Sequence, residues 1–221
     1  DKAEYGIDAV LWYARPAGGI GSIAKILSGA INPSGRLVDT WAADFTKNPS
    51  FVNFGTGCLP DTTDKYDGGM YYSVDYEEGI YVGYRYYETR GETDGEDWYN
   101  ANVVYPFGYG LSYTTFEYSN LKISPAVITP NETVTVTLNV TNTGSRAGDE
   151  VVQLYTRDVV SSVTTYEKNL AGFERVHLQP GETKQITFHL DRKQLELLNA
   201  DMKWVVEPGD FVLMAGASSE D

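Results

Sequence analysis

Residues that build disulfide frameworks and metal centres are nearly missing from this sequence. Its 221 residues include one cysteine, Cys58, and two histidines, His177 and His189. A single thiol cannot form an internal disulfide, and these few residues lack the spacing of a metal-ligand cluster. We therefore expect no metal site. Both histidines are predicted to lie on the surface or at the edge of a sheet.

Basic residues and long apolar runs are also scarce. The sequence has 17 lysines and arginines against 31 aspartates and glutamates, which gives a formal net charge of −14 at pH 7. Such a surface repels phosphate backbones and anionic membranes, so we expect no nucleic-acid or membrane partner. No stretch approaches the ~20 apolar residues of a membrane-spanning helix, and the first residues do not form a signal peptide. The prediction is a soluble protein, and the compartment, bacterial cytoplasm or secreted, stays open.

The N-terminal segment has the pattern of a strand, a glycine loop, a helix and a second strand. The apolar run Ala9–Tyr13 predicts a buried strand, and apolar residues recur on one face of a helix predicted between Ile20 and Leu27. Gly29 is placed to end that helix, and Arg36–Trp41 predicts the second strand. A βα unit normally belongs to a parallel sheet that is covered on both faces. We therefore expect this segment to be part of a larger α/β domain.

Three further segments are predicted to be loops. The glycines of Ala17–Ser22 lack the spacing of a dinucleotide fingerprint, and no Gly-Lys-Ser/Thr follows them. The acidic segment Gly91–Asp97 lacks the residue order of a calcium loop, so we interpret it as a solvated loop. Residues 42–67 have no periodicity and predict a long surface loop that can fold over a neighbouring site or subunit. None of these segments predicts a cofactor.

From Phe116 onward the pattern becomes all-β. The segment Val134–Val140 alternates strictly between apolar and polar residues, as in a strand with one face toward a core. The residues that we expect on the core face are Val134, Val136, Leu138 and Val140. Further short strands between glycine- and proline-containing turns are predicted at 150–156, 170–178, 184–190, 204–206 and 211–215. Such a series is typical of a two-sheet antiparallel β-sandwich.

Two long motifs resemble those of a known enzyme family. They are Glu78-Gly-Ile-Tyr-Val-Gly-Tyr-Arg-Tyr-Tyr and Pro106-Phe-Gly-Tyr-Gly-Leu-Ser-Tyr-Thr-Thr-Phe. In this order they are similar to the C-terminal half of glycoside hydrolase family 3, the group of β-glucosidases and β-xylosidases. The turns that begin at Asn142, Leu178 and Glu207 also resemble those of the fibronectin type III-like domain in this family.

The resemblance implies a fold and a function for nearly the whole chain. Residues 1–114 would be the C-terminal part of the family's α/β sandwich domain, with the long loop and the tyrosine-rich segment. Residues 115–221 would be a fibronectin type III-like, immunoglobulin-like β-sandwich, so the fold class is mainly β with a partial α/β part. The full enzyme would hydrolyse terminal β-linked sugars of oligosaccharides or aryl glycosides, with retention and without a cofactor. The partners of this chain would be the missing barrel and sandwich domains.

No catalytic residue is assigned to this chain. A glycosidase sets two carboxylates across one sugar bond, whereas Glu77 and Glu78 would point to opposite faces of an extended strand. The resemblance places the nucleophilic aspartate on a separate barrel and the acid/base glutamate earlier in the sandwich domain. Neither motif occurs in this sequence, so we expect the isolated chain to be inactive and to support the enzyme by holding its domains and shaping the site entrance.

Several side chains around the first motif have the chemistry of a sugar-binding surface. Their aromatic rings and one forked donor are groups that saccharide sites use. These candidate residues are Tyr76, Tyr81, Arg85, Tyr86 and Tyr87. In the alternative interpretation the tyrosines fasten the α/β part to the β-sandwich, and Arg85 satisfies a carboxylate or carbonyl groups. Both interpretations stay open at this point.

A second hypothesis is a stand-alone β-sandwich module that binds carbohydrate or mediates adhesion. It accounts for the second half of the chain but not for the βα unit or for the first motif. The ends of the chain also predict free sheet edges, because Ala9–Tyr13 has one helix to cover it and Gly216–Asp221 resembles the start of the family's final sandwich strand. Such edges are templates for pairing. We therefore expect either a homo-oligomer or association with the rest of the enzyme.

Overall fold

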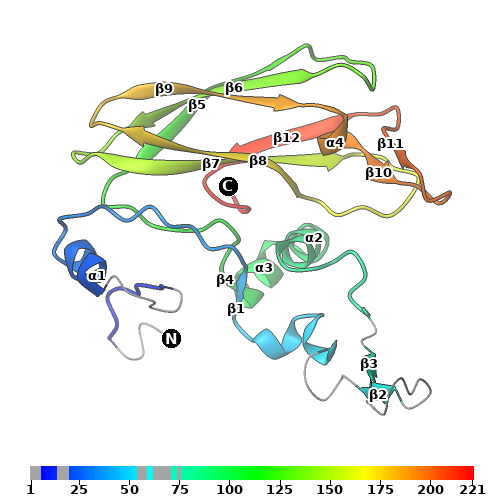
Figure 1. Cartoon of the computed structure of the whole chain (residues 1–221), viewed down its shortest axis with the longest axis horizontal. Coiled ribbons are helices and arrows are strands. Elements are labelled where there is room, and N and C mark those ends of the chain that lie inside the picture. The colour runs from blue at the N-terminus through cyan, green and yellow to red at the C-terminus, as the bar shows by residue number, and fades with distance from the viewer. Residues whose placement is uncertain (1–5, 14–19, 54–58, 62–70, 74–75) are drawn as a thin grey trace.

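The computed structural model describes residues 6–13, 20–53, 59–61, 71–73 and 76–221. It shows two parts: a β-sandwich formed by the second half of the chain, and a smaller part below it that contains the helices α1, α2 and α3 (Figure 1). Cys58 and residues 17–19 of the predicted glycine loop lie outside the described residues, and the other three residues of that loop begin α1. Within the described residues, no helix is both long enough and apolar enough to cross a membrane.

The sandwich consists of two three-stranded antiparallel sheets. One sheet has the order β5-β6-β9 and the other has the order β12-β7-β8. The strands of the first sheet are β5 (Phe116–Ser124), β6 (Val134–Asn142) and β9 (Thr183–Leu190). Those of the second are β7 (Gly148–Asp158), β8 (Asn169–Leu178) and β12 (Phe211–Gly216). The short helix α4 (Arg192–Leu195) and the paired strands β10 (Leu197–Leu198) and β11 (Trp204–Val205) connect β9 to β12.

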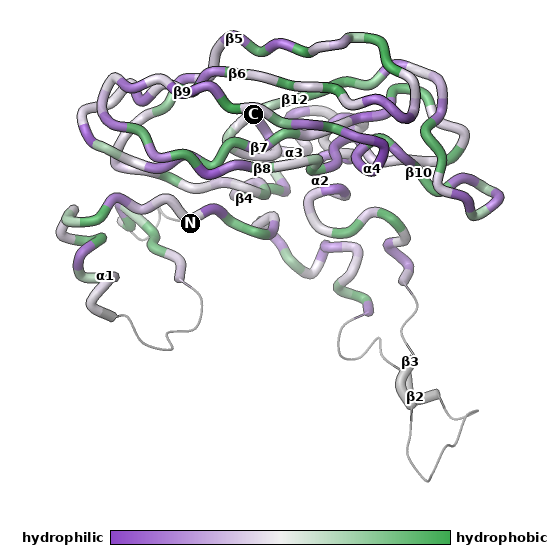
Figure 2. Tube along the Cα trace, turned by 45° about the horizontal axis from the view of Figure 1, so that its top comes forward, coloured by the Kyte–Doolittle hydropathy of each residue, from purple (hydrophilic) through white to green (hydrophobic). Residues whose placement is uncertain are grey.

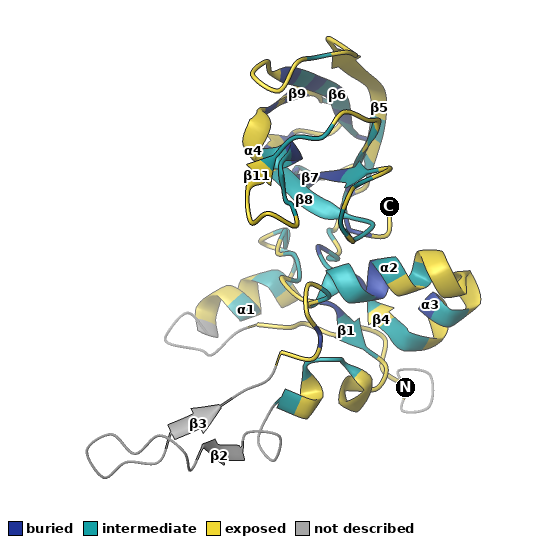
Figure 3. Ribbon diagram, turned by 90° about the vertical axis from the view of Figure 1, so that its right-hand side faces the viewer, coloured by how far each residue is buried: buried dark blue, intermediate teal, exposed yellow. Residues whose placement is uncertain are grey.

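The core of the sandwich lies between these two sheets and follows from the alternation in the sequence. Along β6, buried residues alternate strictly with half-buried ones, and Val134, Val136, Leu138 and Val140 all face the core. This confirms the predicted core face. Hydrophobic and hydrophilic residues alternate along the sandwich strands in Figure 2, and the buried residues gather between the sheets in Figure 3. Apolar side chains from β7, β8 and β9 complete the core: Val152, Leu154, Val176, Leu178, Ile186, Phe188 and Leu190.

The part below the sandwich contains most of the helical structure. Its helices are α1 (Ile20–Leu27), α2 (Tyr84–Asp94) and α3 (Glu96–Asn102), with 3-10 turns at Phe45–Lys47 and Phe51–Asn53. Its strands form two short antiparallel pairs, β1 (Trp41–Ala42) with β4 (Val103–Tyr105) and β2 (Leu59–Asp61) with β3 (Tyr71–Ser73). As predicted, Gly29 follows the end of α1, and its φ of 75° suits a residue without a Cβ. The Gly29 N–H donates to the carbonyl of Ile26 at 2.8 Å.

The prediction of two strands in the N-terminal segment is wrong. Residues 7–13 are irregular and exposed instead of forming a buried strand, because no described strand lies beside them to accept their backbone hydrogen bonds. Of the predicted strand Arg36–Trp41, only Trp41 is in a strand, and β1 pairs antiparallel with β4. A parallel sheet is therefore not formed by the described residues, although the predicted helix is present.

The prediction of a solvated loop for the acidic segment is also wrong, because Gly91–Asp97 belongs to α2 and α3. The two helices meet at Gly95, where a φ of 93° breaks the first helix. Glu96 and Asp97 then occupy the first turn of α3, where carboxylates interact favourably with the helix dipole. The described part of the long loop predicted at 42–67 contains the two 3-10 turns and β2.

Candidate functional site

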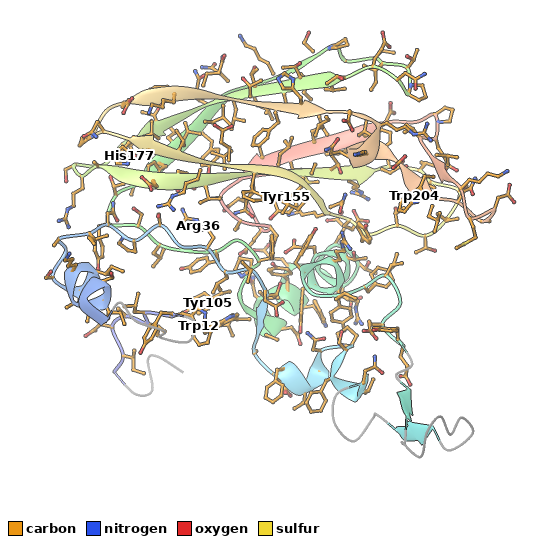
Figure 4. All side chains as sticks on the ribbon, viewed as in Figure 1. Trp12, Arg36, Tyr105, Tyr155, His177 and Trp204 are labelled. Atoms are coloured by element: carbon orange, nitrogen blue, oxygen red, sulfur yellow. The ribbon has the colours of Figure 1, made fainter. Side chains whose placement is uncertain are left out.

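The main candidate site is the junction where α2 lies against the second sheet of the sandwich. Tyr84, the first residue of α2, stacks on Phe107 with ring centroids 4.6 Å apart and meets Tyr155 edge-on at 6.1 Å. Its hydroxyl accepts a hydrogen bond from the backbone N–H of Leu170 at 2.9 Å. Tyr155 is fully buried at the boundary between the two parts (Figure 4). These aromatic contacts fix the position of α2 on β7 and β8.

Arg85, a candidate sugar-binding residue, is directed toward the sandwich. Its Nη2 donates to Asn169 Oδ1 at 2.9 Å, and its guanidinium lies over the ring of Tyr166 at 4.2 Å from the centroid. Both partners belong to the sandwich half of the chain. The side chain therefore has the contacts that the fastening interpretation describes, with an amide oxygen in place of a carboxylate or backbone carbonyl.

Tyr86 and Tyr87 face the other way, into the packing between α2 and α3. Their rings meet edge-on at 5.1 Å, and Tyr87 stacks on Trp98 of α3 at 6.4 Å. Tyr87 is buried, and that burial raises the pKa of its phenol. Tyr81 is half-buried in the turn before α2, whereas Tyr76 is 76% exposed. The structure thus brings Tyr86 and Tyr87 together, whereas it directs Arg85 to the sandwich and leaves Tyr76 exposed.

A buried polar cluster around Glu88 joins α2 and α3 to the last residues of the chain. Glu88 Oε1 accepts hydrogen bonds from the Tyr99 hydroxyl at 2.7 Å and from the Ser219 hydroxyl at 2.6 Å. The ammonium of Lys168 lies 3.4 Å from Glu88 Oε2 and donates to the Ser219 carbonyl. Burial raises the pKa of Tyr99, and the charge of Glu88 raises it further, so the phenol stays a donor. The Ser219 N–H donates to the Phe107 carbonyl at 2.8 Å.

A second buried cluster joins the N-terminal segment to the sandwich. Arg36 Nη2 forms an ion pair with Glu150 Oε2 at 2.6 Å, and the Tyr118 hydroxyl donates to Glu150 Oε1 at 2.8 Å. Burial raises the pKa of Glu150, against the opposing effect of the guanidinium. Asn32 adds a neutral contact, because its Nδ2 donates to the Ala147 carbonyl at 2.9 Å and its Oδ1 accepts from the Tyr113 N–H at 2.7 Å.

The second sequence motif passes between these two clusters, and its glycines allow the close approach. Gly108 has a φ of 82°, and a Cβ there would overlap the side chain of Gln153. Gln153 Nε2 donates to the carbonyls of Gly108 at 3.3 Å and Ala217 at 2.5 Å. A Cβ on Gly110 would overlap the carbonyl of Gly35. The sequence identified the motif, but it did not predict which residues lie against its glycines.

The neighbouring carboxylates of Glu77 and Glu78 lie in two different environments. Residues 77–80 form a turn, which corrects the extended strand assumed for them, yet the expected separation of the two side chains holds. Glu77 is exposed, whereas Glu78 is buried and accepts a hydrogen bond from Asn53 Nδ2 at 2.5 Å. Among the described residues, no group of three or more histidine, cysteine and carboxylate side chains is arranged to hold a metal ion. Glu78 therefore takes part in packing.

Comparison with known proteins identifies the family. Residues 150–219 match a fibronectin type III-like domain. The thermostable β-glucosidase B of Acetivibrio thermocellus is 42% identical over 202 residues, a match that covers 91% of this chain and 24% of that protein. A GH3 β-glucosidase structure from Bifidobacterium adolescentis superposes with a TM-score of 0.73 and 34% identity, covering 91% of this chain and 26% of that one. The chain belongs to glycoside hydrolase family 3.

A third similar protein is the β-glucosidase of Kluyveromyces marxianus, whose structure was solved in complex with glucose. It matches with a TM-score of 0.71 and 39% identity, over 90% of this chain and 21% of that one. The chain thus spans about a quarter of the length of the family 3 relatives it matches, and it corresponds to their C-terminal portion. Its mainly β fold agrees with the fold class expected from the sequence.

Proposed function

We propose that this chain is a non-catalytic support portion of a family 3 enzyme that hydrolyses terminal β-linked sugars with retention of configuration. In the full enzyme it holds the α/β sandwich domain in place and shapes the entrance to the site. The observation that carries this proposal is the junction itself. Two buried ionic clusters, at Glu88 and at Glu150, and the stacked ring of Tyr84 join the helical part to the sandwich. A stand-alone sandwich module has no need of these contacts.

The surface of the helical part supports association with the rest of such an enzyme. Trp12 is 64% exposed and contacts Trp41 edge-on at 5.3 Å. Further large apolar side chains of this part are exposed to solvent: Val10, Leu27, Val38, Phe45, Val52 and Leu111. We infer that these exposed apolar side chains contact another surface. We propose that the catalytic barrel and the remainder of the sandwich domain cover it.

The substrate of the full enzyme is proposed from its relatives and from the reaction class. A β-linked oligosaccharide or aryl glycoside would be cleaved through a covalent intermediate by two carboxylates on the other parts of the enzyme. Within this chain, Tyr76 and Tyr81 keep more freedom to contact a sugar than Arg85, Tyr86 and Tyr87, whose faces are used in packing. We also propose the boundary between residues 114 and 115, just before β5 begins.

Titration of cellobiose and xylobiose into the chain by calorimetry separates support from sugar binding. The support role predicts no saturable heat at any accessible sugar concentration, because Arg85, Tyr86 and Tyr87 are used in packing. Saturable binding that Tyr76→Ala removes would favour the carbohydrate-binding module. Val38→Ala serves as the control, since Val38 is also an exposed side chain and lies far from Tyr76 in sequence.

A further inference from the structure

Two asparagines of the sandwich lie in segments that match the acceptor motif for N-linked glycans. The motif is an asparagine, any residue except proline, and then a serine or threonine. It occurs at Asn131-Glu132-Thr133 and at Asn139-Val140-Thr141. Both copies end in threonine, so the motif alone does not rank them. The structure, in contrast, gives them different environments.

The first copy lies in the connection between β5 and β6. Residues 129–133 are all exposed, and they precede the first residue of β6. The Glu132 N–H donates to the Thr129 carbonyl at 3.0 Å, and the Glu132 carboxylate accepts from the N–H and the hydroxyl of Thr129 at 2.6 and 2.9 Å. These bonds fix the turn and direct the carboxylate back toward Thr129. The side chains of Asn131 and Thr133 take no part in them and stay accessible.

The second copy lies within β6, which is the central strand of its sheet. Asn139 is half-buried and stands opposite Ser119 of β5 on one side and Gln185 of β9 on the other. The hydroxyl of Thr141 is hydrogen-bonded to that of Thr183 at 2.8 Å. Because β6 is paired along both of its edges, an enzyme can surround Asn139 only after the strand has left the sheet.

The turn that holds Asn131 belongs to the sheet that lies away from the helical part. In Figures 1 and 3, the sheet β5-β6-β9 is on the far side of the sandwich from α1, α2 and α3. The junction contacts of Glu88 and Tyr84 lie on α2, and Glu150 lies on β7 of the other sheet. A large hydrophilic group on this turn therefore leaves the junction uncovered.

We propose that Asn131 is an acceptor for an N-linked oligosaccharide in the folded chain and that Asn139 is not. The amide nitrogen of Asn131 forms a bond to C1 of the first sugar of a polyprenyl-diphosphate-linked oligosaccharide. The bond between C1 and the diphosphate oxygen breaks, polyprenyl diphosphate leaves with that electron pair, and the amide releases one proton to the transferase. The hydroxyl of Thr133, which the turn leaves exposed, is the group that the motif requires for recognition. This inference does not depend on the proposed glycosidase role.

The test uses the folded chain, a single-subunit oligosaccharyltransferase and a polyprenyl-diphosphate-linked oligosaccharide. Intact-mass measurement should show one added glycan per chain, and peptide mapping should place it on Asn131. Asn131→Gln and Thr133→Ala should each abolish the addition, whereas Asn139→Gln should leave it unchanged. Peptide N-glycosidase should remove the glycan and convert the asparagine to aspartate, which confirms the linkage to the amide nitrogen.

Two synthetic peptides with the sequences of residues 127–135 and 135–143 are matched controls for the effect of the fold. Both should accept the glycan, because neither holds its asparagine in a sheet. In the folded chain, modification of Asn139 should be at least about tenfold slower than that of Asn131, since β6 must first open. Modification of the peptides but not of the folded chain would overturn the proposal. So would equal rates at Asn131 and Asn139 in the folded chain, or a 127–135 peptide that accepts no glycan.

Discussion

Two ion pairs in this molecule differ mainly in how much water reaches them. The side chains of Arg36 and Glu150 are 9% and 3% exposed, whereas Arg175, paired with Asp149, is 61% exposed. Removing one partner of a buried pair leaves an unpaired buried charge, so Arg36→Met should lower the free energy of unfolding by about 3–5 kcal/mol. Arg175→Met should lower it by less than about 1 kcal/mol. Urea denaturation measures both, and similar losses would contradict this account of the junction.

Asp149 gives a prediction about pH. Burial raises its pKa, but the hydrogen bonds from His177 and Arg175 outweigh this effect and hold the pKa below the ordinary value of 3.8. The unfolded chain therefore takes up the proton first as the pH falls, and the stability from this carboxylate is present above pH 3.8 and lost below it. In urea titrations from about pH 5 to pH 2, Asp149→Asn should show a shallower loss of stability than the original chain. Parallel curves would show that the carboxylate is not stabilised.

At the level of single residues, exposure was predictable from the sequence for some side chains and not for others. Both histidines are exposed, as predicted. Glu88 and Glu150, in contrast, carry no local pattern that marks them as buried, because their partners Ser219 and Arg36 are more than a hundred residues away. A buried carboxylate becomes recognisable only when the fold brings its donors together.

At the scale of elements, β6 offers a direct test of the sandwich core. Leu138 is buried between the sheets, while its neighbour Thr137 points to the opposite face. Leu138→Ala removes buried methyl groups and leaves a cavity, so it should cost about 2–5 kcal/mol of unfolding free energy. Thr137→Ala should change it by less than about 0.5 kcal/mol. A comparable loss from both substitutions would mean that the two faces of β6 are not distinguished by burial.

The elements that the sequence predicted best are those whose pattern is local. Strict alternation located β6, and flanking turns located β7, β8, β9 and β12 to within a few residues, whereas β5 was not predicted as a strand. The strand at Ala9–Tyr13 failed because an apolar run needs a neighbouring strand, and none of the described strands provides one. The segment Gly91–Asp97 failed because its helices are held by the packing of Tyr99 on Gly91 and by Trp98, not by a helical apolar stripe.

For the whole molecule, the junction predicts that the helical part and the sandwich unfold together. Trp12, Trp41 and Trp98 lie in the helical part, so fluorescence of a Trp204→Phe variant reports on that part alone, while circular dichroism reports on the sandwich strands. The two urea midpoints should coincide. Glu88→Ala leaves Tyr99, Lys168 and Ser219 without their shared partner and should lower the fluorescence midpoint first.

The matched control for this coupling is Glu92→Ala on the exposed face of the same helix. It should leave both midpoints unchanged, because Glu92 has no buried partner among the described residues. Separate midpoints in the Trp204→Phe chain itself would contradict the junction as a rigid connection.

Whether this chain carries out chemistry is tested most directly by hydrolysis of an aryl β-glucoside. The account predicts that the purified chain releases no product above a buffer blank, because positioned carboxylates supply the chemistry and Glu78 is committed to packing with Asn53. Glu77→Gln and Glu78→Gln should likewise show no change. Turnover above the blank that either substitution abolished would contradict the central claim that this is a support portion of a family 3 enzyme.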